Sequence, residues 1–430
     1  MIAQFNTCDI ENYGDLLYPL VLQALLRQRK VSQPVIPTAF LAGKAPQAAG
    51  YQVRNISELL RSVAREPTTL VIGGGDILRT DSQILAAHYH GIFLQRKQQI
   101  LDRSQQAWLA SAQERFPNWL RRLTRSSVAT AAPTIPADDH ELTDEFSERF
   151  FGHSELGPFL LDRANYPDLH QLIYLSCGVP FAIDPAEASR VSAALDSATF
   201  IYLRDEPSRQ KLQQAGVRSQ LHVAPDIVVT LSDIFPAEEL RGAGRALMQA
   251  QGVTGERPIV CFQCHPVDGP SADLIINRLL EYQRQTGAEI VLLPIGYCHD
   301  DTAILRHIAH YGYGKFHYLE LPSVHSIMAV IAASDLFAGT SLHGNITAFS
   351  YGVPHLLCSG RLDKVGGFME QVGIRDEQLL PSWSRLSDSL GQLQQLDRQL
   401  LVDRAARAKA IVQRTMDELI SRGIRAEAVT

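Results

Sequence analysis

The sequence has few of the features that mark disulfide-rich, membrane-spanning or nucleic-acid-binding proteins. It contains 6 cysteines in 430 residues at irregular spacing, which is typical of reduced thiols rather than of a disulfide framework. No apolar run is long enough for a membrane-spanning helix. The formal net charge is −6, so no overall basic field favours nucleic acid. An anionic substrate must therefore be bound by locally placed cations.

Signals for a metal site and for secretion are also weak. Cys261 and Cys264 form a Cys-x-x-Cys pair beside His265, but no second pair lies at the spacing of a zinc site, so we predict no metal. The first six residues do not combine a basic segment with an apolar one, as a signal peptide would. We expect a cytoplasmic protein, with a position at the inner face of the membrane as the alternative.

The length of the chain exceeds what one hydrophobic core usually holds. Short apolar runs alternate with segments of helical spacing over residues 1–240 and again over residues 257–386. This alternation predicts an α/β protein with two Rossmann-like domains that face a central cleft, as in GT-B-like folds. Residues 387–430 have helical spacing and are expected to form a C-terminal helical tail.

The alternation lapses over about residues 78–168, which predicts a helical insertion in the first domain. Within it, residues 116–125 are basic and amphipathic. Such a segment either contacts a membrane surface or covers a neighbouring element with its basic side in solvent. Contact with a membrane would suit a lipid-linked substrate.

The segment 335–354 is the most informative part of the chain. An apolar run at 336–338 stops at Gly339 in a polar turn, and an apolar helical pattern resumes at Ile346. This order predicts a strand, a loop and a short helix whose N-terminus carries unpaired N–H groups and the positive end of the helix dipole. Such a place suits an anion, and His343 lies in it as a titratable group. The alternative is a structural loop in which His343 only caps the helix.

Two earlier loops have a similar position after a strand or before a helix. Asp15 precedes a helical pattern, so it is either the helix cap or a residue of the site. Residues 69–72 predict a buried strand that ends in three glycines, which let the backbone approach a ligand or a neighbouring loop closely. Asp76 follows them and either caps the next element or holds a sugar hydroxyl.

A third loop follows the predicted strand 200–203. Arg204 lies at its carboxyl end, where a guanidinium binds phosphate or carboxylate well, and Asp205 either holds Arg204 or caps the helix 206–215. The alternative is a purely structural ion pair. We also expect His265 to face the same edge of its sheet, and Lys364 to lie in a loop that closes over the cleft.

Taken together, these segments resemble the polysaccharide pyruvyl transferase family. Gly-Thr-Ser-Leu-His-Gly at 339–344, with Gly-Val-Pro at 352–354, resembles the family's C-terminal motif. The other matches follow in the family's order and span most of the chain: 12–15, 73–76, Arg204-Asp205 followed by Ser208, Leu212 and Gly216, and 225–226.

The resemblance implies transfer of the pyruvyl group of phosphoenolpyruvate to two hydroxyls of a sugar, giving a cyclic ketal and phosphate. The acceptor would be a cell-envelope polysaccharide or exopolysaccharide, or its lipid-linked precursor, and no cofactor is required. His343, Arg204 and Asp15 would be catalytic. The resemblance further implies that the following residues bind substrate: Asn12, Gly14, Gly74, Gly75, Asp76, Asp205, His265, Ser341, Gly344, Asn345 and Lys364.

Ser341 departs from the family, because its best-known members carry arginine immediately before the Leu-His pair. Three interpretations remain open: the same donor with a cation elsewhere, such as His265; a different donor; or binding without catalysis. Two other functions are therefore kept, a GT-B-type glycosyltransferase that uses a nucleotide sugar, and a non-catalytic sugar-binding protein.

Overall fold

The computed structural model describes residues 1–46, 48–79, 157, 159–266, 271–321, 323–358, 362–374, 378–422 and 424, with 362–366 as backbone only. The chain divides into two compact units, Met1–Arg79 with Phe159–Thr430, and Thr80–Pro158. The first unit is described below. Most of the predicted insertion at 78–168, including the basic segment 116–125, lies outside the described residues.

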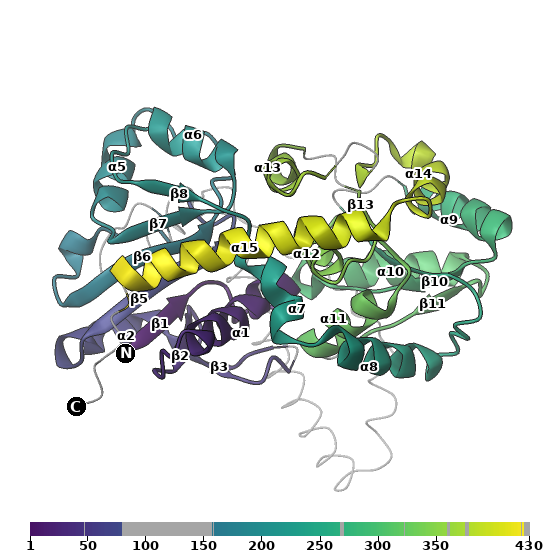
Figure 1. The fold of residues 1–430 in the computed structure, drawn as a ribbon, viewed down its shortest axis with the longest axis horizontal. Helices are drawn as coiled ribbons and strands as arrows, with labels where there is room; N and C mark the ends of the chain where they lie inside the picture. Colours follow the sequence, from purple (N-terminus) through teal and green to yellow (C-terminus); the bar gives the residue numbers. More distant parts are fainter. Residues whose placement is uncertain are drawn as a thin grey trace, which may run out of the picture. The chain divides into compact units, whose positions relative to one another are not determined.

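The first half of this unit is built on one sheet with the strand order β3-β4-β2-β1-β5-β6-β7-β8 (Figure 1). All neighbouring strands are parallel except the edge pair β3 and β4. The strands are β1 (Ile2–Phe5), β2 (Val35–Ala39), β3 (Gly43–Lys44), β4 (Gln52–Asn55), β5 (Thr68–Gly75), β6 (Leu169–Cys177), β7 (Phe200–Leu203) and β8 (Leu221–Val223). Strand β5 is buried along its whole length, which explains its continuous apolar run.

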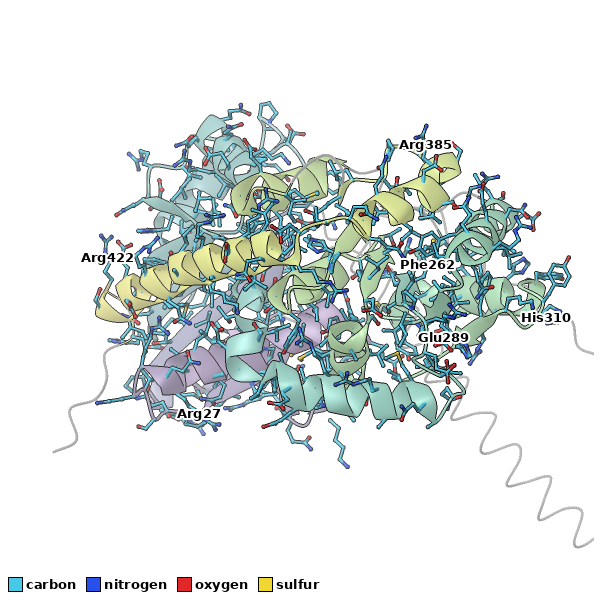
Figure 2. All side chains as sticks on the ribbon, turned by 45° about the vertical axis from the view of Figure 1, so that its right-hand side comes forward. Arg27, Phe262, Glu289, His310, Arg385 and Arg422 are labelled. Atoms are coloured by element: carbon cyan, nitrogen blue, oxygen red, sulfur yellow. The ribbon has the colours of Figure 1, made fainter. Side chains whose placement is uncertain are left out.

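The second half is built on a parallel sheet with the order β11-β10-β9-β12-β13. Its strands are β9 (Ile259–Gln263), β10 (Glu289–Leu292), β11 (Phe316–Tyr318), β12 (Leu336–Gly339) and β13 (His355–Leu357). Phe262 of β9 is fully buried, whereas Arg385 and His310 lie at the surface of this half (Figure 2).

Each sheet has one place where the strand order reverses. In the first sheet the chain proceeds from β1 to β2 and β4, and then returns to the other side of β1 with β5. In the second it proceeds from β9 to β10 and β11, and returns to the other side of β9 with β12. Ligands of open α/β sheets bind at such reversal points, outside the carboxyl ends of the strands. The loops after β1, β5, β9 and β12 are therefore where a site is expected.

The helices of the described residues agree broadly with the predicted alternation. They are α1 (Tyr13–Gln28), α2 (Ile56–Ser62), α5 (Ala188–Asp196), α6 (Glu206–Gln214), α7 (Leu231–Ile234), α8 (Ala237–Gln249), α9 (Ala272–Thr286), α10 (Asp301–Tyr311), α11 (Val324–Ala333), α12 (Leu342–Ser350), α13 (Leu362–Val372), α14 (Leu386–Leu393) and α15 (Arg398–Arg422). None of these helices is both long and apolar enough to cross a bilayer.

Two sequence predictions about local structure are wrong. Asp15 is not the helix cap, because α1 begins at Tyr13 with Asn12 in the capping position, so Asp15 lies in the first turn. Lys364 is not in a loop, because α13 continues through Gly366 and Gly367. A Cβ atom at Gly367 would lie 2.6 Å from the Cβ of Asp205, so packing against α6's capping residue explains a glycine inside this helix.

One hydrophobic cluster spans both halves. Buried side chains of α1, such as Leu17 and Val21, belong to the same apolar cluster as Ile327 of α11 and Phe349 of α12. Helix α15 extends along both halves, with Arg398 paired to Asp335 near the second sheet and its other end beside the first (Figure 1). This shared packing keeps the start of α12 against α1.

Candidate active site

Helix α12 begins directly after β12 and is capped by a side chain. The Oγ of Ser341 accepts a hydrogen bond from the backbone N–H of Gly344 at 3.2 Å. The amide of Asn345 donates to the carbonyl oxygens of Gly339 and Ser341 at 3.0 and 2.8 Å. These bonds satisfy groups that a strand-to-helix turn otherwise leaves unpaired. Ser341 and Asn345 thus hold the turn that presents His343.

The imidazole of His343 contacts the first half through Tyr18 of α1. Its Nε2 lies 3.0 Å from the Tyr18 hydroxyl and 3.8 Å from Oδ2 of Asp226. The Tyr18 hydroxyl donates a hydrogen bond to that same Oδ2 at 2.5 Å. The two rings meet edge to face, with centroids 5.5 Å apart. The His343 side chain is 12% exposed and that of Asp226 is 1% exposed, so the contact is largely shielded from water.

Asp226 is held as an anion although it is buried. Burial alone would raise the pKa of its carboxyl, but the hydrogen bond and charge of His343, with the Arg204 guanidinium and the Tyr18 hydroxyl, lower it below its ordinary value. Its Oδ1 also accepts the backbone N–H of Val228 at 3.0 Å. Burial and the charge of Asp226 raise the pKa of the Tyr18 phenol, which therefore stays protonated.

The glycines at the end of β5 make room for these contacts. A Cβ atom at Gly74, where φ is +96°, would lie 2.2 Å from the Tyr18 ring. The N–H of Gly75 donates to the Tyr18 hydroxyl at 3.2 Å. The glycine run therefore lets an aromatic side chain of the site approach the backbone closely. Of the two possibilities given by the sequence, a ligand or a neighbouring segment, these contacts are with a neighbouring segment.

Asp15 lies beside this group, on the first turn of α1. Its Oδ2 accepts hydrogen bonds from Thr7 at 2.7 Å and from the amide of Asn12 at 2.9 Å. Burial raises the pKa of the Asp15 carboxyl, although these bonds and the charge of His343 act against the increase. Its Oδ1, by contrast, accepts no hydrogen bond from the described residues and is the side of the carboxylate nearest Gly75.

The backbone of Asp15 has an unusual partner that fixes its position. Pro19 lies inside α1 and has no N–H to donate to the carbonyl four residues earlier. The amide of Asn6 fills this gap by donating to the Asp15 carbonyl at 2.9 Å. Asp15 is thereby tied to the loop after β1 by both its backbone and its side chain.

Arg204 lies at the carboxyl end of β7, as predicted, and is buried among carboxylates. Its Nη2 donates to Asp76, and its Nε lies 3.7 Å from Oδ2 of Asp205 without a hydrogen bond. Burial alone would lower the pKa of Arg204, but these two carboxylates and Asp226 raise it. Asp205 also caps α6, since its Oδ1 accepts the N–H of Ser208 at 2.7 Å. Arg204 is therefore a charged residue already committed to acidic partners.

A second polar cluster lies at the reversal point of the second sheet. The side-chain oxygen of Gln263 accepts the backbone N–H of Ser341 at 2.9 Å and the hydroxyl of Thr340 at 3.3 Å. Thr340 in turn accepts the N–H of His265 at 3.0 Å. The His265 ring lies edge to face with that of His299, with centroids 5.3 Å apart.

Asp301 holds Gln263 of this cluster by a hydrogen bond. Its Oδ2 accepts hydrogen bonds from Nε2 of Gln263 at 2.7 Å and from the N–H groups of Ile295 and Gly296 at 3.1 and 2.8 Å. Gly296 forms an isolated antiparallel bridge with Asn12 of the first half. Hydrogen bonds thus run from the start of α12 to Asn12, the capping residue of the helix that carries Asp15.

Most residues predicted for the site lie in two adjoining groups. The first surrounds His343 and contains Asn12, Gly14, Asp15, Gly74, Gly75, Asp76, Arg204 and Asp205. The second contains His265 and Ser341. Gly344 packs against the ring of Phe337, where a Cβ would lie 2.6 Å away. The side chain of Lys364 lies outside the described residues.

Tyr18 and Asp226 were not assigned to the site from sequence. Tyr18 lies four residues after Gly14, so both share one face of a helix, which is the signal that would have placed it beside His343. Asp226 lies in the match to the family at residues 225–226, but the sequence indicated no role for its side chain. In the described part of the chain, no three His, Cys, Asp or Glu side chains are grouped to hold a metal ion.

Comparison with known families gives one match. The family model for polysaccharide pyruvyl transferase matches residues 143–360, which include Arg204, Asp226 and the whole of α12. A comparison with curated proteins finds no match.

Solved structures provide similar folds. HepE from Anabaena in complex with UDP-glucose gives a TM-score of 0.51 at 12% sequence identity, with 98% of this chain and 99% of HepE covered. Its complex with UDP and glucose gives 0.50 at 12% identity, with 98% of each chain covered. UDP-GlcNAc 2-epimerase from Neisseria meningitidis gives 0.49 at 12% identity, with 97% and 99% covered. The HepE structures confirm the predicted arrangement of two Rossmann-like halves, and at this identity they show the fold alone.

Proposed function

The chain belongs to the polysaccharide pyruvyl transferase family, and from this premise we propose that it moves the pyruvyl group of phosphoenolpyruvate onto a sugar diol. The acceptor is a cell-envelope polysaccharide or exopolysaccharide, or its lipid-linked precursor, and the product is a cyclic ketal. The observation that supports this most is the convergence of His343, Asp15 and Arg204, which come from three separate parts of the chain.

The reaction requires three events at the donor. A proton is added to the methylene carbon, with the C=C electron pair forming the new C–H bond, and positive charge develops at C2. One sugar hydroxyl then bonds to C2, and the second hydroxyl replaces the phosphate, which leaves with the electrons of its C–O bond. Both hydroxyls lose their protons. The site must therefore supply one acid, one base and groups that bind two anionic ends of the donor.

We assign the acid to His343 and the base to Asp15. An imidazole exchanges protons near neutral pH, and His343 is largely shielded from water in the contact with Tyr18. Asp15 has one carboxylate oxygen engaged by Thr7 and Asn12, whereas Oδ1 is available to a hydroxyl. The raised pKa of Asp15 makes it a better proton acceptor than an exposed aspartate.

Arg204 is assigned to the carboxylate or phosphate of the donor. Its guanidinium is bonded to Asp76, the more exposed member of the pair at 22% against 4%. A bound anion would compete with Asp76 for Nη2, whereas Nε has no hydrogen-bond partner among the described residues. Ser341 carries no positive charge where the best-known members of the family have arginine. We therefore assign the binding of the donor's anionic group to Arg204.

The alternative is a glycosyltransferase that uses a nucleotide sugar, and one observation favours it. HepE, whose fold is similar, is known in complex with UDP-glucose. A sugar-binding protein without catalysis is the remaining alternative.

Calorimetric titration with phosphoenolpyruvate, and with UDP as the comparator, tests the proposal. We expect phosphoenolpyruvate to bind the wild type and to bind His343→Ala about 10-fold or more weakly, because a charge-assisted contact is lost. His310→Ala is the matched control, since His310 lies on the surface of α10 (Figure 2). Binding of UDP alone would overturn pyruvyl transfer in favour of the glycosyltransferase. Heat from neither ligand would favour the binding protein.

A further inference from the structure

The Tyr18 hydroxyl is the centre of a small, fully occupied hydrogen-bond network. It lies 2.5 Å from Oδ2 of Asp226, 3.2 Å from the N–H of Gly75 and 3.0 Å from Nε2 of His343. A tyrosine hydroxyl has one hydrogen to donate and two lone pairs to accept with. Three partners therefore use the whole hydrogen-bonding capacity of the Tyr18 hydroxyl.

With Asp226 ionised, only one distribution of hydrogens satisfies all three partners. The backbone N–H of Gly75 is a donor, so it takes one lone pair of the hydroxyl. The carboxylate of Asp226 only accepts when ionised, so it takes the hydroxyl hydrogen. The remaining lone pair of Tyr18 has to accept from His343, whose Nε2 must then carry a hydrogen.

We infer that Tyr18 and Asp226 are positioning residues that hold His343 in the tautomer with hydrogen on Nε2, so that Nδ1 exchanges the proton with the donor. The inference rests on the proposed function, since it specifies which nitrogen of the proposed acid reacts.

The opposite tautomer requires Asp226 to be protonated. A neutral Asp226 would donate to Tyr18, and Tyr18 would then donate to Nε2 of His343. The lowered pKa of Asp226 opposes this arrangement. The 1% exposure of Asp226 also leaves no water to replace Tyr18 as its partner.

Nδ1 faces the segment that carries Asp15. A Cβ atom at Gly14 would lie 2.0 Å from Nδ1, so this edge of the ring lies directly over the start of α1. The charges of His343 and Asp15 also interact. The proposed acid and the proposed base therefore lie close together, with Nδ1 on the edge of the ring nearest α1.

The proton transfer is balanced with this assignment. The Nδ1–H bond of the imidazolium breaks and leaves its electron pair on Nδ1, while the C=C pair of the donor forms the C–H bond. The hydrogen on Nε2 stays bonded to that nitrogen throughout and is donated to the Tyr18 hydroxyl. Asp226, next to that hydroxyl, stabilises the imidazolium before transfer.

The nitrogen shifts of His343 test the inference without any substrate. The wild type is labelled with 15N-histidine, and the signals of His343 are identified by their loss in His343→Gln. At a pH where the ring is neutral, we expect a protonated Nε2 and an unprotonated Nδ1. In Tyr18→Phe the ring should populate both tautomers. Hydrogen on Nδ1 in the wild type would overturn the inference, even if Tyr18→Phe did not fold.

Steady-state kinetics with phosphoenolpyruvate add a second readout. We expect Tyr18→Phe and Asp226→Asn to lower kcat by about 10- to 100-fold while KM changes little, because proton transfer and not binding is affected. Tyr282→Phe is the control, since it removes another buried hydroxyl, which accepts a hydrogen bond from Gln394. An unchanged kcat in Tyr18→Phe would contradict the inference. The predicted tautomer without any pyruvyl transfer would refute the proposed function alone.

Discussion

The imidazole of His343 lies so close to the backbone of Gly14 that a Cβ atom there would be 2.0 Å from Nδ1. Gly14 belongs to α1 of the first half and His343 to α12 of the second. The glycine therefore has a steric role in this structure, because it lets a helix of one half contact the candidate acid of the other.

Gly14→Ala tests this relationship. The added methyl group would displace the His343 ring from Tyr18, and we expect a loss of about 10²-fold in kcat/KM with a stability cost of about 1–3 kcal/mol. Activity assays and urea unfolding measure the two effects. Gly242→Ala is the matched control: this exposed glycine of α8 has no atom within 4 Å of its added Cβ, so the change should be neutral or slightly stabilising. Full activity in Gly14→Ala would show that the ring is not held as described.

Ser341→Ala separates the two roles of the residue that departs from the family. Loss of the cap on Gly344 should lower the free energy of unfolding by about 1 kcal/mol. If capping is the main role, the KM for phosphoenolpyruvate should stay nearly constant, and Ser341→Thr should restore the stability. A large increase in KM at unchanged stability would instead indicate that the Ser341 hydroxyl binds the donor phosphate.

The sequence was sufficient for those features that depend on neighbouring residues. Strand β12, the turn after Gly339 and helix α12 are each encoded within a few positions, and they lie where the apolar pattern predicted them. The end of α6 near Gly216 is equally local, since that glycine has a φ of +84°.

Features that depend on distant packing were missed. The sequence gives no local sign of the role of Tyr18, because its contact with Asp226 joins residues 208 positions apart. The segment around Lys364, predicted to be a loop, is a helix, and the close approach of Asp205 to Gly367 explains why a residue of low helix propensity occurs in it. Asp76 and Asp226, whose charges act on Arg204, also come from separate loops, so their effect on the guanidinium was not visible in the sequence.

Substitution of Asp301 tests the hydrogen-bond network that links it through Gln263 to the backbone of Ser341. Asp301→Ala would leave Nε2 of Gln263 and two backbone N–H groups without their shared acceptor, and we expect a loss of about 3 kcal/mol or more in stability. Asp301→Asn keeps one carbonyl oxygen for those donors, so its loss should be clearly smaller. Urea unfolding of both variants measures the difference. Equal losses would mean that volume, and not the acceptor, is what matters at this position.

His355 predicts how stability depends on pH. It is fully buried in β13, with Nδ1 3.0 Å from the carbonyl oxygen of Val353, and burial lowers the pKa of its imidazole to about 4. In the unfolded chain the pKa returns to about 6.5, so the unfolded state binds more protons between these values. The contribution of His355 is therefore present above about pH 6.5 and is lost as the pH falls toward 4.

Between about pH 7.5 and pH 5 this loss amounts to about 2 kcal/mol. His355→Asn keeps a donor for the Val353 carbonyl but does not titrate, so its stability should fall by about 2 kcal/mol less than that of the wild type over this range. Urea unfolding at the two pH values measures the difference, with His310→Asn as the control for an exposed imidazole. Parallel pH profiles for the wild type and His355→Asn would show that protonation of this buried ring does not limit stability in acid.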